Sequence, residues 1–189
     1  PLFVWMGEIL FRTKLSENLF KGLSPWMQKL PGGLIHVNIV GCALFAAISG
    51  SSAATVATVG KMSIPELRKR NYPEKILLGS LAGSGTLGLL IPPSIILIIY
   101  GVAVQESIAK LFIAGIVPGI MIALIFMSYV IIWSLINKKD MPKILEEHSF
   151  FEKIKRSKQL LPVILLISAV IGSIYTGIAT ATEAASLGV

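Results

Sequence analysis

The sequence predicts an all-α polytopic membrane protein built around a re-entrant helical hairpin and a discontinuous helix. The 189-residue chain is 54% hydrophobic and 14% charged, whereas soluble domains carry about 25% charged residues. Its mean hydropathy is +0.78. Four long segments contain no Asp, Glu, Lys or Arg, and they cover residues 33–60, 76–105, 111–136 and 160–182. Each exceeds the roughly 20 residues that a helix needs to cross a bilayer.

Composition excludes several other classes of protein. A single cysteine, Cys42, excludes a disulfide scaffold and any multi-cysteine metal site. The net charge of +7 does not indicate nucleic-acid binding, because long apolar segments separate the basic residues. The charge bias of cytoplasmic membrane loops explains that distribution better.

Residues 1–32 are expected to hold the end of a preceding span and then an arm helix in the membrane interface. Residues 12–31 mix charges with apolar side chains, as interfacial helices do, and Trp26 is a typical interfacial anchor. A plain connecting loop explains the pattern equally well. Because the chain opens with Pro1 and stops at Val189 in an apolar stretch, we expect an internal piece of a longer protein.

The segment 33–60 is expected to form the re-entrant hairpin. Small and polar residues, Ser49 to Ser52, occupy its middle, where glycine permits a sharp change of direction. Arms of about 12 residues would reach roughly 18 Å, or about mid-bilayer. The charge-rich residues 61–75 would then form a cytoplasmic loop.

The segment 76–105 is expected to form the discontinuous helix. It contains glycines at positions 79, 83, 85 and 88, followed by Pro92 and Pro93 near its middle. Proline inside a helix costs about 3 kcal/mol and glycine about 1 kcal/mol. An unbroken helix is therefore improbable, and irregular backbone in a bilayer must be buried in protein or line a cavity.

The remaining segments are simpler. Residues 111–136 are expected to span the membrane. Residues 137–159 are expected to form an amphipathic cytoplasmic linker with affinity for anionic lipid. Residues 160–189 would begin another span, with Pro162 near its start, where a missing N–H matters least.

Counting basic residues favours the hairpin. If 33–60 enters and leaves on one side, 16 of the 17 basic residues share that side and only Lys110 lies opposite. If 33–60 spans fully, the split is 12 against 5. The sharper asymmetry places the basic loops in the cytoplasm.

Helix breaks at the midplane bring backbone carbonyls and helix termini within reach of substrates and coupling ions. The carbonyls suit a hard cation such as sodium, and the start of the helix after the hairpin turn favours an anionic group. Neither broken segment contains a carboxylate. Small residues also allow close packing of membrane helices, so a non-catalytic assembly subunit is an alternative. An intramembrane serine hydrolase is another, although His36 is the one histidine or lysine within 33–60 that could serve as base.

Several motifs together resemble the large membrane subunit (M subunit) of tripartite ATP-independent periplasmic (TRAP) transporters. They occur in the order and spacing of that family: GGLIHVN at 32–38, FAAISGSSAAT at 45–55, IPPS at 91–94 with YG at 100–101, LFIAGIVPG at 111–119, and GIATATEAA at 177–185. The resemblance runs through nearly the whole chain. It implies one of two inverted repeats of an elevator-type secondary transporter, with residues 160–189 as the truncated start of the second repeat.

The resemblance also implies a binding site. Carried over by position, the sodium ligands would be Ser49, Ser51, Gly88, Ile91 and Pro93. Substrate would lie beside the same tip, near Ser52 and Thr55, although some family members have Asp where this chain has Thr55. The family usually has Pro where this chain has Ala181, so the turn near Glu183 is expected to differ.

By the same resemblance the protein is not an enzyme. It lies in the bacterial inner membrane and uses a sodium gradient to import organic acids such as C4-dicarboxylates or sialic acids. Its partners would be a periplasmic substrate-binding protein and a small membrane subunit, separate or fused. The chain would be less than half of a full subunit and would not transport alone.

Overall fold

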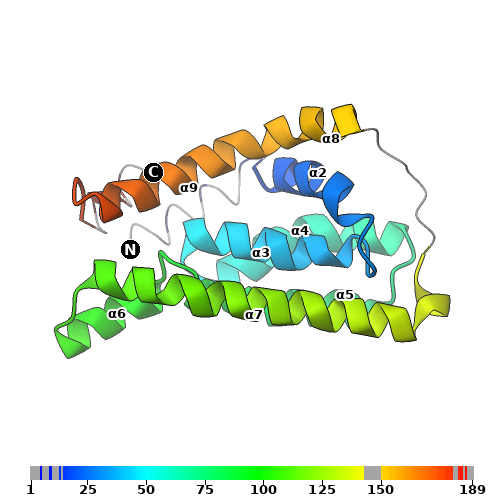
Figure 1. Ribbon diagram of the computed structural model, residues 1–189, viewed down its shortest axis with the longest axis horizontal. Coiled ribbons are helices and arrows are strands. Elements are labelled where there is room, and N and C mark those ends of the chain that lie inside the picture. The colour runs from blue at the N-terminus through cyan, green and yellow to red at the C-terminus, as the bar shows by residue number, and fades with distance from the viewer. Residues whose placement is uncertain are drawn as a thin grey trace.

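The computed structural model describes residues 15–142 and 150–180 and six isolated positions, which are Trp5, Ile9, Thr13, Glu183, Ala184 and Ser186. Every regular element in this described part is a helix, and the long helices lie side by side (Figure 1). The all-α prediction is confirmed. The expected end of a preceding span lies almost wholly outside the described residues, as do residues 143–149 of the expected linker and Ala181.

The first described helix, α2 (Leu15–Met27), is amphipathic and packs against the protein on its apolar face. Leu19, Phe20 and Leu23 are buried, whereas Glu17 and Lys21 are exposed and form an ion pair. Trp26 is 41% exposed, and its indole N–H donates to Ser157 Oγ at 2.8 Å. A residue expected as an interfacial anchor therefore also ties α2 to the distant helix α8 (Phe150–Ser157).

Residues 33–60 form two packed helices with a short interruption between them. Helix α3 (Ile35–Ser49) ends at Gly50, and α4 (Ser52–Lys69) begins directly after Ser51. The two helices pack against each other and run in opposite directions (Figure 1). Twelve of the 15 residues of α3 are buried, so this helix forms the centre of the molecule. Its position in a membrane stays a prediction.

The structure differs from the expected loop over residues 61–75. Helix α4 continues to Lys69, and a connection of four residues separates it from the next helix, α5 (Glu74–Gly85). Charged residues end an apolar run but not a helix, because Lys, Arg and Glu are good helix formers. Across the short connection Arg68 Nε donates to Glu74 Oε1 at 3.1 Å, and this hydrogen bond lowers the pKa of Glu74.

The segment 76–105 is interrupted near its middle. Helix α5 passes into a 3-10 helix, η1 (Thr86–Leu89), and regular helix resumes only at α6 (Ile95–Val104). The prolines occupy the gap, with a cis peptide bond between Pro92 and Pro93. This interruption lies where the two prolines predicted it.

Within the residues that the structure describes, two helices are long and apolar enough to cross a membrane, by length and composition. One is α7 (Ile108–Ile136), and the other runs through Phe151–Tyr175. The second starts earlier than the expected residue 160, because α8, the 3-10 turn η3 (Lys158–Leu160) and α9 (Leu161–Tyr175) follow without a gap. Another 3-10 turn, η2 (Lys138–Asp140), follows α7.

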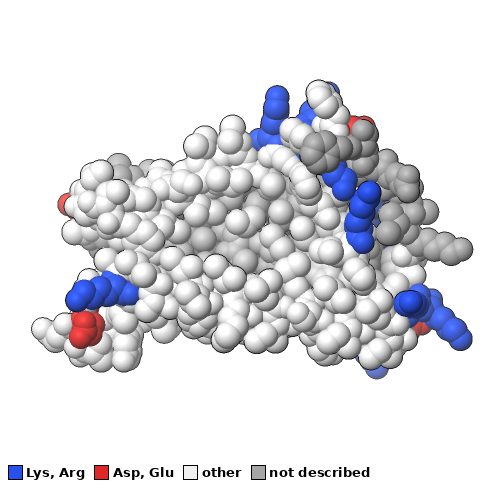
Figure 2. Space-filling model, viewed as in Figure 1, with Lys and Arg blue, Asp and Glu red and all other residues white. Residues whose placement is uncertain are grey.

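Basic side chains gather at one end of the molecule. Figure 2 shows them where Figure 1 places the α4–α5 connection, the end of α7 and helix α8. Lys110 lies near the start of α7, at the opposite end. Because α3 and α4 are antiparallel, both arms of the hairpin reach the basic end, which is the arrangement that the charge count favoured.

The packing of α2 on η3 can be tested at Gly22. A Cβ atom there would lie 2.6 Å from Leu160 Cγ, so we expect Gly22→Val to destabilise the complete protein by about 1–3 kcal/mol through overpacking. The measurement is the free energy of unfolding in mixed micelles. Gly172→Val is the control, because nothing lies within 4 Å of a Cβ at Gly172. Equal stability of the two variants would contradict the described packing.

Candidate functional site

The tip of the α3–α4 hairpin is a two-residue turn stabilised by caps on both helices. Gly50 ends α3 in the left-handed conformation, with φ of 59°, and its N–H donates to Ala46 O. Glycine is the residue that adopts this conformation without steric cost. Ser51 then caps α4, because its Oγ accepts from the Ala54 N–H at 3.5 Å. The sequence Ser-Gly-Ser is therefore sufficient to end one helix and start the next.

Buried hydroxyl groups form hydrogen bonds within the turn. Ser49 and Thr55 are fully buried, and their hydroxyl oxygens lie 2.8 Å apart. Thr55 Oγ1 also donates to Ser51 O at 2.8 Å, and Ser49 Oγ lies 3.3 Å from the same carbonyl. Thr55 therefore uses its hydroxyl within the tip, and a substrate group could bond that hydroxyl only by displacing one of these contacts.

The break between α5 and α6 frees backbone carbonyls. Pro92 has no N–H to give to the carbonyl of Gly88 four residues earlier. Pro93 likewise has no N–H to donate to Leu89 O, which instead accepts a hydrogen bond from Ser94 Oγ at 2.8 Å. Ser94 is fully buried. The result is a short stretch of irregular backbone in which the regular helical hydrogen bonds are interrupted.

The two breaks lie against each other. The Ile95 N–H, at the start of α6, donates to Gly50 O at 3.3 Å. A Cβ at Gly50 would lie 2.8 Å from Pro93 O, and a Cβ at Gly88 would lie 3.0 Å from Ser52 N. Both of these close backbone contacts therefore require glycine, at Gly50 and at Gly88. Two segments that are about 40 residues apart in the chain form one buried contact between unwound backbones.

This contact brings together most of the residues predicted to bind sodium. Ser49 and Ser51 belong to the tip, while Gly88 and Pro93 approach it from the second break. The Ile91 side chain instead lies towards α7, since a Cβ at Gly119 would be 2.9 Å from Ile91 Cγ1. The role of all five residues as sodium ligands stays a prediction.

The chemistry of the contact is that of neutral oxygen atoms. Within the described residues, no group of three or more His, Cys, Asp or Glu side chains could hold a metal ion. Carbonyl and hydroxyl oxygens suit hard cations, so this donor set fits sodium. Ser52 Oγ is buried, and no described group bonds to it, which leaves one hydroxyl beside Gly88 available to a ligand.

Sequence reasoning missed two residues that build this contact, Ser94 and Ile95, and one role of Gly50. Gly50 was expected to permit the change of direction at the turn, but it is also the point where Pro93 approaches α3. Ser94 and Ile95 were not singled out, although one satisfies Leu89 O and the other bonds Gly50 O. The signal for Ser94 was its position directly after two prolines, where a hydroxyl can replace a missing N–H.

Comparison with known proteins identifies the family. Residues 1–189 match the family described as "Tripartite ATP-independent periplasmic transporter, DctM component". The chain belongs to this family. The resemblance seen in the TRAP motifs is thereby confirmed over the whole chain.

Curated relatives of this TRAP chain are named transporter permeases. It is 37% identical over 188 residues to the C4-dicarboxylate TRAP transporter large permease protein DctM of Pseudomonas aeruginosa, covering 99% of this chain and 43% of the relative. It is 35% identical to the sialic acid TRAP transporter large permease protein SiaM of Vibrio cholerae, covering 99% of this chain and 43% of the relative. It is 34% identical to the ectoine/5-hydroxyectoine TRAP transporter large permease protein UehC of Ruegeria pomeroyi, covering 98% of this chain and 43% of the relative.

These relatives bear on two further expectations. The TRAP chain spans less than half the length of each of these relatives. The relatives are permease subunits and not enzymes, as expected. The geometry agrees, because His36 lies 13 residues before Ser49 in the same helix α3, about 20 Å away. His36 Nε2 is bonded to Pro31 O at 2.7 Å, so it does not serve Ser49 as a base.

The contact between the breaks can be tested at Gly50. A side chain there costs about 1–2 kcal/mol in the left-handed region and also displaces Pro93 O. We expect Gly50→Ala to speed hydrogen exchange of the Ile95 amide roughly 5–30-fold, measured on the complete protein. Gly41→Ala is the control, because its Cβ would meet Val59 at an ordinary 3.6 Å. Unchanged exchange in the Gly50 variant would contradict the bond to Gly50 O.

Proposed function

We propose that the complete protein containing this chain is the large membrane subunit of a sodium-coupled, binding-protein-dependent secondary transporter. One observation carries this proposal: two helix breaks meet in a buried contact that is rich in neutral oxygen atoms. Discontinuous helices in transporters use such unwound carbonyls for coupling ions and helix starts for anionic substrates. Membership of the TRAP family supports the same assignment.

In this proposal Ser49, Ser51, Gly88, Ile91 and Pro93 provide the oxygen ligands of sodium. The hydroxyl of Ser49 and the carbonyl of Ser51 already lie within 3.3 Å of each other. The carbonyl oxygens carry only partial negative charge, and the site contains no carboxylate. A bound sodium ion would therefore give the site a net charge of +1. That charge would favour an anionic substrate next to it.

Substrate would bind beside the hairpin tip at the start of α4. Ser52 provides a hydroxyl without a described partner, and the first turn of an 18-residue helix favours negative charge. Relatives named for C4-dicarboxylate and sialic acid transport support organic acids as the substrate class. Thr55 would contribute mainly by holding Ser51 in place.

The proposed location is the bacterial inner membrane, with several spans and the basic end of Figure 2 in the cytoplasm. The family description, a tripartite periplasmic transporter, supports two partners. These are a periplasmic substrate-binding protein and a small membrane subunit. The elevator-type movement expected for the family would carry the hairpin and the broken helix together, since the Ile95–Gly50 hydrogen bond links them.

The experiment is sodium-dependent uptake by the complete complex in proteoliposomes, with a panel of organic acids. Losing one contact to a charged ion is worth about 1.5–3 kcal/mol, so Ser49→Ala should raise the sodium concentration for half-maximal uptake about tenfold or more. Ser128→Ala is the matched control, since Ser128 is exposed on α7 and bonds Leu124 O.

Two results would overturn the proposal. Uptake that is insensitive to sodium in the unmodified complex would exclude sodium coupling. An unchanged sodium requirement in both Ser49→Ala and Ser51→Leu would exclude the proposed site. If these variants reduce the yield of assembled complex while the sodium requirement stays constant, the small residues only pack helices, as in the assembly alternative.

A further inference from the structure

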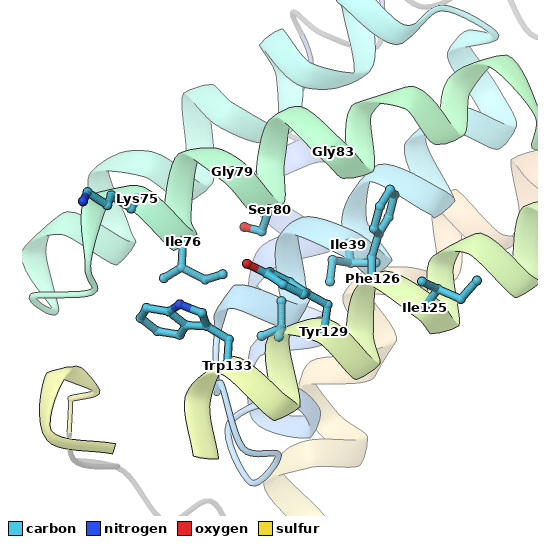
Figure 3. A pocket seen from close by; sticks show the side chains of 11 residues that line it. Ile39, Lys75, Ile76, Gly79, Ser80, Gly83, Ile125, Phe126, Tyr129 and Trp133 are labelled. Carbon is cyan, nitrogen blue, oxygen red and sulfur yellow. The ribbon is translucent and has the colours of Figure 1, made fainter. Parts of the chain in front are cut away.

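A groove between α5 and α7 lies away from the contact of the two breaks. It is a cavity of about 600 Å³, within the range of sites that hold a small molecule. Its walls are the two antiparallel helices, and Ile39 of α3 contributes to its lining (Figure 3). The transport proposal uses none of the residues that line it.

Missing side chains on α5 create the groove. Gly79 and Gly83 lie one helical turn apart on the wall that faces α7. A Cβ at Gly79 would meet nothing within 4 Å, and one at Gly83 would meet only Phe126, at 3.7 Å. The glycines therefore do not serve close helix packing here, since close packing would fill the space above them.

The lining changes from apolar to basic along the groove. Ile125 and Phe126 lie at the end near Gly83, and Trp133 lies near Ile76 and Lys75 at the other end (Figure 3). Lys75 is exposed, and no ion pair or hydrogen bond joins it to another residue in the part of the chain that the structure describes. An apolar channel with an aromatic side chain and a free cation at one end matches the profile of a membrane interface.

The wall formed by α7 is exposed along most of its length. Only 17% of its most apolar stretch of 18 residues is buried, and Tyr129, which lines the groove, is 59% exposed. For a helix that spans a membrane, this surface is in contact with lipid tails or with other membrane segments. Where lipid covers this surface, the groove opens towards the bilayer, and its occupant would enter from there.

We infer that this α5–α7 groove binds one anionic phospholipid. An acyl chain would lie along Gly79 and Gly83 beside Phe126, and the headgroup phosphate would pair with Lys75. Lys138 and Lys139, which follow α7 at the same end of the molecule, add positive charge near the headgroup. Clusters of basic residues at the cytoplasmic surface attract anionic lipids, and the basic end in Figure 2 is the proposed cytoplasmic end.

The test uses the complete permease in phosphatidylcholine nanodiscs that contain phosphatidylglycerol with a photoactivatable acyl chain. After illumination, labelled peptides are identified by mass spectrometry. We expect adducts on residues of the groove, with Phe126 and Tyr129 among them. A phosphatidylcholine probe of the same acyl chain should label these residues about fivefold less, since a lysine near the membrane surface favours anionic lipid by about that factor.

Two variants test the two ends of the site separately. Gly79→Leu fills the channel, and Lys75→Gln removes the charge from an exposed position where folding is not at risk. Each should reduce labelling of the groove several-fold. Gly172→Leu is the matched control, because it adds the same side chain to another helical glycine that has nothing within 4 Å.

Three results would overturn the inference. Labelling that is equal for the two probes would show only unselective contact with bulk lipid. Labelling that persists in both Gly79→Leu and Lys75→Gln would place the lipid elsewhere. A photocrosslinking amino acid at Tyr129 that captures a protein segment, from the rest of the permease or from a membrane partner, would show that protein fills the groove.

Discussion

The structure depends on how two stretches of non-helical backbone provide for each other's hydrogen-bonding groups. Irregular backbone inside a bilayer is costly unless protein groups replace the missing hydrogen bonds. Here Gly50 O receives the Ile95 N–H, and Leu89 O receives the Ser94 hydroxyl. The absence of side chains at Gly50 and Gly88 allows the approach. Neither break would be stable alone in lipid, and together they create a polar contact in an apolar protein.

The helices around this contact are arranged to cover it. Helix α3 is buried on nearly all of its surface, and α7 closes over the second break. Gly115 and Gly119 permit that closure, since Cβ atoms there would lie 2.8 Å from Leu90 O and 2.9 Å from Ile91 Cγ1. These two glycines thus allow α7 to pack directly on the second break.

Local features of the fold could be predicted from the sequence, but the contacts between distant elements could not. Ser49–Gly50–Ser51 and the two prolines determine where helices stop, because they act through their own backbone. The extension of α4 to Lys69 was missed, because a charged boundary was treated as a helix boundary. The pairing of Gly50 with Pro93, and the direction of Ile91 towards Gly119, depend on the packing of helices distant in sequence. No local pattern contains that information.

The burial of α3 has a consequence for biosynthesis. Among the described elements that contact α3, α2 precedes it in the chain, whereas α4, α5, η1, α7 and α9 follow it. The ribosome therefore completes α3 before most of the surface that encloses it has been synthesised. The helix acquires all of these contacts only when synthesis has passed through α9, so α3 is made before most of the described elements that enclose it.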